Sequence, residues 1–559
     1  MTRTSHKLIY TAGLTALLLG AAGCKDQLDV GNPNQPTLQA NVTNEAGITA
    51  LAQGGVYING FLNNNTWLGN SYFSLPWGYI ELMGDMVGAD ASNNQVTTIG
   101  VPDYIILDNG TKLTNPAPQV SIIRAYNNRA ATANANNPLV YQWQSMYALN
   151  NACNQVLSVV DKVSFTGDKA SRANTVKAWA YWWKGFAYAQ IGSLYYAGLL
   201  VDDYGVTNNN YVLNTAVIEQ SNKYYNLAAS TLTAIKSTDD YTSVMGELIP
   251  AESQVGLGGV PTVDMWKRSI NTMLARNILF NKLAPFVKNN PAATITKSLM
   301  PVMSTNDWNT VLTLTNNGIQ KGDMVFMGRS TAANSFFSAS GGTVAALSVG
   351  VNTGTTFKVS ERFIQNFGPS DQRLANNFNT NTRYNNNYNF TTRYSVIDGG
   401  LGKPGVAIYG TKGVGKYELY IAGSYEENAL MQAEANIRLG NIEAGLKQVD
   451  AVRTAQGAGV AATVGKNLNL AQALQEVVKE RRVSLFMRGV SYYDSRRWGW
   501  TYDIANGGGS YGNTVVTSAG VVNTNATINY NFMDYWDVPA DESVLNPTGS
   551  SVATKNPNY

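Results

Sequence analysis

Hydrophobic residues recur every three or four positions along several long stretches of the chain, which predicts amphipathic helices that pack against one another. We expect helices over residues 45–57, 77–86, 141–160, 173–196, 221–235, 265–283, 307–316, 417–439, 442–454 and 474–486. In the stretch 173–196, Trp179, Trp182 and Trp183 alternate with Ala and Gly, as happens where two helices pack closely. We therefore expect these three tryptophans to lie in the core.

The junction Gly440-Asn441, between two of the expected helices, is the most informative for architecture. Gly440 suits the left-handed conformation that often ends a helix. Small residues followed by Leu439-Gly440 and Glu443-Ala444 resemble the tetratricopeptide pattern, in which helical hairpins stack because none buries its apolar face alone. The prediction is a mainly α fold with a tetratricopeptide-like scaffold of about four degenerate helical pairs (about 45–60, 141–196, 221–320 and 417–499).

Two long stretches, about 61–139 and 321–416, sustain no helical period apart from the short piece at 77–86. Gly, Ser, Thr and Val dominate residues 321–357, as in short strands and turns. We expect both stretches to be irregular, loop-rich insertions on the ligand-facing side, with a few short strands. Residues 24–559 are then one large domain.

The N-terminus has the pattern of an export signal. Arg3 and Lys7 precede the short apolar run 8–19, and Ala21-Ala22-Gly23 leads to Cys24. The apolar run is too short to remain as a membrane-spanning helix. The small residues before Cys24 resemble a bacterial lipoprotein box, which predicts a signal peptide over 1–23 and lipid on Cys24. An ordinary secreted protein that begins with cysteine is the alternative.

Composition excludes several kinds of site. The net charge is +3 and no basic block is present, so nothing indicates nucleic-acid binding. His6, within the predicted signal peptide, is the only histidine, and Cys24 and Cys153 are the only cysteines. A Ser-His-Asp triad, a Cys-His pair and a zinc site rich in His or Cys are therefore excluded. We expect Cys153 to be a buried thiol and expect no cofactor; the sequence neither supports nor excludes a structural calcium ion.

Arginines and acids concentrate in the run 480–499. Arg481 and Arg482 fall on or beside the apolar face of the predicted helix, where a guanidinium needs a carboxylate or an aromatic ring. We interpret the run as a structural clasp that locks the last helical pair through buried ion pairs and cation–π contacts. Its members are Glu480, Arg481, Arg482, Asp494, Arg497 and Trp498.

The order Glu-Arg-Arg, Arg-Gly, Tyr-Asp and Arg-Arg-Trp-Gly in this run is similar to the C-terminal signature of the SusD/RagB family. Asp371-Gln372-Arg373 and the ending 535–542 also resemble that family. The resemblance implies a lipid-anchored, surface-facing protein of the outer membrane of a Gram-negative bacterium. It would capture an oligosaccharide for a TonB-dependent, SusC-like β-barrel transporter.

Sugars offer hydroxyl groups and flat CH faces, so a site for them needs amides and aromatic rings. Three stretches supply both: 67–79, 104–128 and 378–390, with 104–128 favoured. The candidate ligand-binding residues are Trp67, Tyr104, Arg124, Tyr126, Asn127, Asn128, Tyr384 and Tyr388. Trp77 is expected in the core instead.

Three alternatives stay open: an oligopeptide receptor of the same architecture, a scaffold whose loops bind nothing, and a glycosidase that uses two carboxylates. Glu81 and Asp85 are four residues apart and could serve the last. At this spacing on a helix we expect a solvated face or local structural contacts, and we predict that the protein is not an enzyme.

Overall fold

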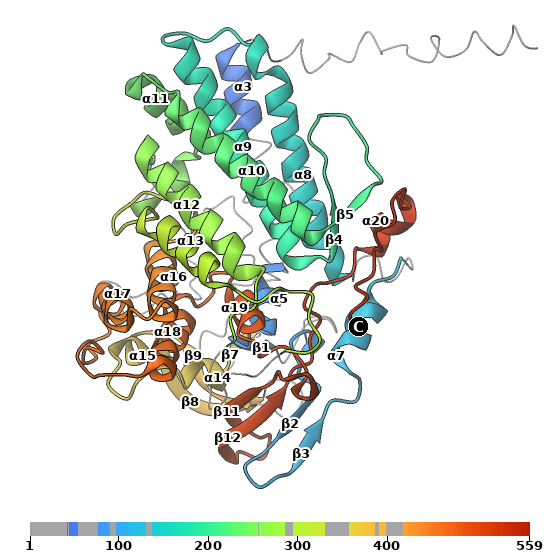
Figure 1. The fold of residues 1–559 in the computed structure, drawn as a ribbon, viewed down its shortest axis with the longest axis vertical. Helices are drawn as coiled ribbons and strands as arrows, with labels where there is room; N and C mark the ends of the chain where they lie inside the picture. The colour runs from blue at the N-terminus through green and yellow to red at the C-terminus, as the bar shows by residue number, and fades with distance from the viewer. Residues whose placement is uncertain are drawn as a thin grey trace, which may run out of the picture.

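The computed structural model describes residues 42, 44–53, 76–89, 97–129, 137–254, 256–285, 295–329, 357–385, 391–397 and 418–559. The predicted signal peptide, Cys24, Trp67 and Tyr388 lie outside the described residues. Helices fill the upper half and one side of the molecule, and a sheet lies at its lower end (Figure 1).

Long helices packed side by side form the upper half. They are α8 (Pro138–Val159), α9 (Lys169–Leu194) and α10 (Asn214–Thr233), with α3 (Glu45–Ala52) and α11 (Thr238–Leu248) against them. Trp179, Trp182 and Trp183 of α9 are at most 3% exposed, and their rings surround Phe326 at centroid distances of 4.9–5.8 Å. Their predicted place in the core is confirmed. Cys153 of α8 is a buried free thiol, as predicted.

A second group of helices continues the scaffold. α12 (Val263–Phe280) packs on α13 (Thr305–Asn316), α16 (Tyr425–Arg438) on α17 (Ile442–Ala455), and α18 (Leu470–Ser484) on both α16 and α17. Gly440 has φ of +90°, and its N–H donates to the carbonyl of Ile437, so it ends α16 as predicted. The mainly helical fold with a scaffold of helical pairs is confirmed.

Short elements connect and cover the scaffold. The helices are α5 (Pro76–Met83), α7 (Gln119–Tyr126), α14 (Glu361–Ile364), α15 (Gln372–Asn377), α19 (Ser491–Arg497) and α20 (Ala540–Leu545), with 3-10 turns at Val160–Lys162, Ala251–Ser253, Gly256–Gly258 and Ile504–Asn506. Three antiparallel pairs of strands join β1 (Val87–Ala89) to β7 (Phe357–Val359), β4 (Ala197–Leu199) to β5 (Tyr211–Leu213), and β6 (Met327–Arg329) to β10 (Glu418–Tyr420).

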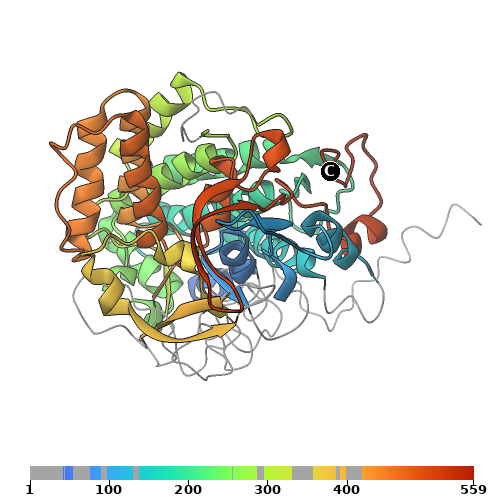
Figure 2. The same cartoon turned by 90° about the horizontal axis from the view of Figure 1, so that it is seen from below.

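The lower end is a six-stranded antiparallel sheet in the order β3-β2-β12-β11-β9-β8. Its strands are β2 (Tyr104–Ile106), β3 (Lys112–Thr114), β8 (Phe378–Asn385), β9 (Thr391–Val396), β11 (Ser510–Val516) and β12 (Val522–Asn529). Seen from below, these strands lie beside the orange helices α16, α17 and α18 (Figure 2). The sheet therefore joins three segments that are far apart in the sequence.

Two expectations about these segments are wrong. Residues 104–128 are not a loop, because they contain β2, β3 and α7; strands of three residues are too short to show a period, and β2 pairs with β12 more than 400 positions away. The helix expected from 417 begins only at Tyr425, since residues 418–420 form β10.

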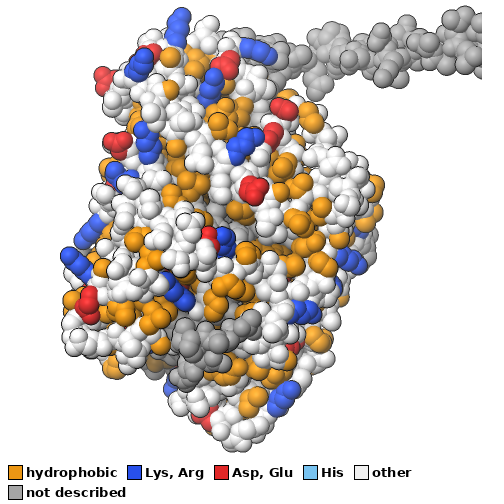
Figure 3. Space-filling model, in the orientation of Figure 1, with side chains coloured by type: hydrophobic (Ala, Val, Ile, Leu, Met, Phe, Trp, Pro, Cys, Tyr) orange, Lys and Arg blue, Asp and Glu red, His pale blue; other side chains and the backbone are white. Residues whose placement is uncertain are grey.

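Buried side chains from Val42 to Val538 form one large core cluster, and a smaller one lies between α16, α17 and α18. On the face shown in Figure 3, charged side chains of both signs are scattered among uncharged ones, in keeping with the charged content of 14%. In the described ranges, no helix combines the length and the apolar character needed to cross a membrane.

Candidate functional site

Two of the ligand residues predicted between 104 and 128 hold the C-terminal tail. Arg124 of α7 pairs with Asp537 at 2.9 Å and donates to the carbonyl of Tyr559 at 2.7 Å. The Asn127 side chain accepts from the N–H of Ala540 at 2.7 Å. Because these polar groups bond to residues 537–559, they hold that segment against α7 and are not free to bind a ligand.

The other three have more local contacts. The Tyr126 hydroxyl lies 3.1 Å from that of Thr98, and the Asn128 amide donates to a backbone carbonyl of α7 at 2.6 Å. Tyr104 of β2 is half-buried, and the Lys112 ammonium lies 3.7 Å from the centroid of its ring. Tyr384 belongs to β8, but its side chain is outside the described part of the structure. These residues do not gather around one cavity.

The C-terminal clasp brings two arginines and two acids together in the core. Asp494 of α19 receives both Arg481 and Arg497 at 2.8 Å, and Arg497 also donates to Glu434 of α16 at 2.6 Å. Burial opposes ionisation of Glu434, but Arg497 outweighs it and lowers the pKa of Glu434 to about 2. The Arg497 guanidinium lies 4.9 Å from the centroid of the Trp498 ring.

Glu480 has partners other than the neighbouring arginines expected from the sequence. The Glu480 carboxylate pairs with Arg373 of α15 at 2.6 Å and with Arg453 of α17 at 2.8 Å, so the clasp also holds α15. Burial raises the pKa of Glu480, but these two guanidinium groups outweigh it and hold the pKa below its usual value. Arg482 is buried and donates to two backbone carbonyls, those of Gly84 and Asp85, at 3.0 and 2.9 Å.

Glu81 and Asp85 are buried, so the expected solvated face is wrong and local structural contacts are what the structure shows. Glu81 accepts from the N–H of Gly489 at 2.8 Å, and burial raises its pKa to about 7. Asp85 pairs with Arg362 at 2.8 Å. Both carboxyl groups are engaged within the protein and neither faces a cavity as a pair.

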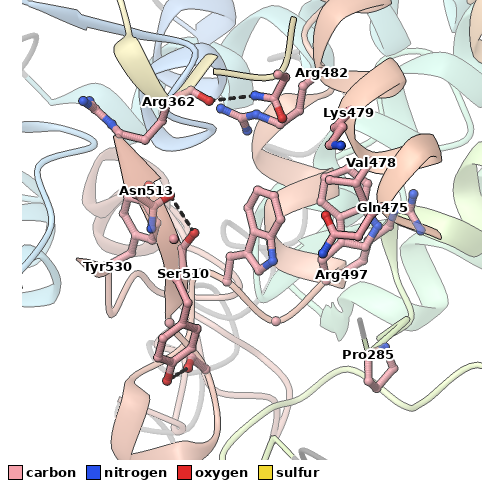
Figure 4. A pocket seen from close by; sticks show the side chains of 18 of the residues that line it. Pro285, Arg362, Gln475, Val478, Lys479, Arg482, Arg497, Ser510, Asn513 and Tyr530 are labelled. Carbon is pink, nitrogen blue, oxygen red and sulfur yellow. Dashed lines mark hydrogen bonds between the residues drawn. The ribbon is translucent and has the colours of Figure 1, made fainter. Parts of the chain in front are cut away.

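A cavity of about 410 Å³ opens beside the clasp, between α18 and β11. Ligand pockets of proteins have volumes of roughly 300–1,000 Å³. Gln475, Val478, Lys479 and Arg482 lie on one side of it, and Ser510, Asn513 and Tyr530 on the other (Figure 4). We call it the α18–β11 pocket. It is the candidate functional site.

Helical spacing creates the first wall of the pocket. Gln475, Val478, Lys479 and Arg482 occupy positions i, i+3, i+4 and i+7, which share one face of α18. Trp500, two residues after Trp498 of the clasp, is half-buried and lines the pocket. The Arg482 guanidinium lies 5.7 Å from the centroid of the Trp500 ring. An aromatic ring, an amide and two cations therefore converge from α18 and the segment after α19.

The loop before β11 creates the second wall. A side chain on Gly508 would meet the carbonyl oxygen of Tyr502 at 2.2 Å, so only glycine allows the chain to pass this close. The loop leads to Tyr511, which is 47% exposed, and to Asn513, both of which line the pocket. Aromatic and amide groups thus face the pocket from this side too.

The sequence patterns do not predict this pocket. They place Trp498 in the clasp and give no role to Trp500, two positions later. The glycine run 507–509 followed by Tyr511 is a turn next to an aromatic residue and was the available signal. The predicted residues Tyr104, Arg124, Tyr126, Asn127 and Asn128 are not among the residues that line the pocket. The described residues hold no group of three or more His, Cys, Asp or Glu side chains placed to bind a metal ion.

Known proteins resemble this chain in its C-terminal sequence and in its fold. Residues 425–559 match the model of the SusD family. A protein solved with a xylogluco-oligosaccharide is 15% identical, with 89% of this chain and 96% of that chain covered and a TM-score of 0.52. A Bacteroides vulgatus protein is 14% identical (93% and 99% covered, TM-score 0.51). A SusD superfamily protein from Parabacteroides distasonis is 14% identical (92% and 99% covered, TM-score 0.50).

At these identities the solved structures show a shared fold. No curated protein matches the sequence. The segment that matches the family model contains α16 to α19 and most of the residues that line the α18–β11 pocket. The shared fold covers 89% of the chain. Residues 425–559 are thus similar in sequence to the SusD family, and the fold is similar to that of a solved SusD superfamily protein.

Proposed function

We propose that the protein is an oligosaccharide receptor and that the α18–β11 pocket is its binding site. The observation that carries the proposal is the convergence of Trp500, Gln475 and Asn513 on one cavity of about 410 Å³. An indole ring offers a flat apolar face to a sugar ring, and amides offer both a donor and an acceptor to its hydroxyl groups. The xylogluco-oligosaccharide bound by a protein of the same fold supports this ligand class.

The receptor would act at the surface of the outer membrane, held there by lipid on Cys24, and would deliver its ligand to a TonB-dependent, SusC-like transporter. The lipoprotein-like sequence before Cys24 and the similarity of residues 425–559 to the SusD family support this part of the proposal. Extraction of the native protein in mild detergent tests it. A large β-barrel that copurifies with the protein is expected, and recovery of the protein free in aqueous buffer without lipid would contradict it.

Isothermal titration with a panel of oligosaccharides tests the binding site. Trp500→Ala should weaken binding about 10-fold, since loss of an aromatic contact and its buried area costs ~1–2 kcal/mol and 1.4 kcal/mol is a factor of ten. Tyr204→Ala is the matched control, because Tyr204 is 45% exposed and does not line the pocket. Equal affinities for Trp500→Ala and the wild type would overturn the assignment, and binding of peptides alone would favour the oligopeptide receptor.

A further inference from the structure

The charged side chains that line the α18–β11 pocket, among the described residues, all have the same sign. They are Arg362, Lys479, Arg482 and Arg497, and no aspartate or glutamate lines the pocket with them. A cavity walled by one sign of charge concentrates the field of those charges on whatever enters it. The lining is therefore electropositive, although the whole chain carries a net charge of only +3.

Two of these cations form ion pairs with acids that lie outside the pocket. Arg362 pairs with Asp85 at 2.8 Å, and Arg497 pairs with Asp494 and Glu434 in the clasp. Their acids do not line the pocket. These two guanidinium groups therefore shape the wall and contribute little net charge to it.

Arg482 and Lys479 supply the remaining positive charge. The Arg482 guanidinium donates hydrogen bonds to two neutral carbonyl groups. Burial lowers the pKa of Arg482, against the attraction of Asp85, which is shared with Arg362. The ammonium of Lys479 lies 3.2 Å from Glu476, a carboxylate that also receives Arg453 at 2.8 Å. Arg453 is also paired with Glu480, and the Lys479 side chain is 45% exposed. A partly exposed ion pair is weak, so the Lys479 ammonium remains available to a ligand.

The two cations are close to the aromatic platform. Arg482 lies over Trp500, and Lys479 is one helical turn before Arg482 on the same face of α18 (Figure 4). A sugar ring stacked on Trp500 would hold a substituent within reach of these side chains. An anionic substituent gains a charge-assisted hydrogen bond there, which is about twice as strong as a neutral one.

We infer that the α18–β11 pocket selects saccharides that carry an anionic group, either the carboxylate of a uronic acid or a sulfate ester. This inference rests on the proposed function, because it names the class of saccharide for that site. Neutral sugars would still stack on Trp500 but would lack the contact with Lys479.

Titration of the full mature chain with tetragalacturonic acid, its fully methyl-esterified form and a sulfated oligosaccharide tests the inference. Tetragalacturonic acid or the sulfated probe should bind at least about 10-fold more tightly than the neutral ester in 50 mM salt, and the preference should shrink in 500 mM salt. Whichever anionic probe shows the preference identifies the anion. Equal binding of all three probes would overturn the inference and leave the proposed function standing. If neither these probes nor any neutral oligosaccharide bound to the protein, both the inference and the proposed function would be overturned.

Lys479→Met separates charge from packing. The methionine keeps the apolar stem, and Glu476 keeps Arg453, so the fold should be unaffected. The variant should lose most of the preference for the anionic probe, with its affinity for the neutral ester within about twofold of the wild type. Lys447→Met, an exposed position on α17, should leave both affinities unchanged. An undiminished preference in Lys479→Met would overturn the inference.

Discussion

Arg481 and Asp494 face each other across the junction of α18 and α19, with Nε and Oδ2 2.8 Å apart and side chains only 0% and 5% exposed. Asp494 also forms an ion pair with Arg497, and Arg497 forms a second ion pair with Glu434 of α16. Because buried charges are stable only when they are paired, this chain of contacts fixes how α18, α19 and α16 sit together. One wall of the α18–β11 pocket is the surface of that assembly.

Arg481→Ala should lower the free energy of unfolding by ~3–5 kcal/mol, the usual cost of breaking a buried ion pair. Denaturant unfolding at pH 7 measures the effect. Lys479→Ala on the same helix is the matched control, since the Lys479 side chain is 45% exposed and should change stability by no more than ~0.5 kcal/mol. An Arg481→Ala protein as stable as the wild type would show that the clasp is not structural.

Acid should weaken the protein through the same clasp. The pKa of Glu434 falls from 4.5 to about 2 on folding, so its stabilising contribution is complete above pH 4.5 and is lost as the pH falls toward 2. At ~1.4 kcal/mol for each pKa unit, this one group accounts for ~3 kcal/mol. Unfolding free energies measured between pH 6 and pH 3 should fall steeply, and Glu434→Gln should flatten the slope. The same slope in both proteins would contradict this account.

Glu81 should act in the opposite direction. Its pKa rises from 4.5 to about 7 on folding, so the folded state favours the protonated form, and that advantage is lost as the pH rises through 7. Glu81→Gln keeps an uncharged side chain at every pH. Relative to this variant, the wild type should lose up to ~3 kcal/mol between pH 4.5 and pH 8, measured by denaturant unfolding. A difference that does not change with pH would show that the burial of Glu81 is already compensated.

Arg124→Ala should loosen the C-terminal tail without weakening the binding of saccharides. Loss of its pairing with Asp537 and of its bond to Tyr559 should increase hydrogen exchange over residues 550–559, at a cost of ~2 kcal/mol in stability. Arg129→Ala is the control, because the Arg129–Asp541 pair is longer, 3.6 Å, and more exposed. Loss of saccharide affinity in Arg124→Ala alone would return α7 to the list of binding elements.

Local sequence patterns predict the helices well because the spacing of apolar residues that marks a helix lies within the helix itself. Gly440 and the periodic residues on both sides of it indicate two helices and a turn, and the structure has α16 and α17 there. The sheet left no comparable signal, since Tyr104 of β2 pairs with Asn529 of β12 and such distant pairing cannot be read from one segment. For this reason the sequence predicts a loop over residues 104–128, where the structure has β2, β3 and α7.

The site was harder to predict than the fold. Trp498 and Trp500 are chemically identical and both line the pocket, but Trp498 is only 3% exposed, with the Arg497 guanidinium near its ring, whereas Trp500 is half-buried. Arg124 and Asn127 likewise have the composition of a sugar site but serve the C-terminal tail. Residue type indicates which chemistry a side chain offers, and only the packing of the chain distinguishes a binding residue from a structural one.

The most direct measurement of the central claim is a crystal structure of the protein with the oligosaccharide that binds it most tightly in titration. The account predicts density for a sugar ring in the α18–β11 pocket, stacked on Trp500, with a substituent at Lys479. An empty pocket in a crystal that holds the ligand elsewhere on the protein would contradict it.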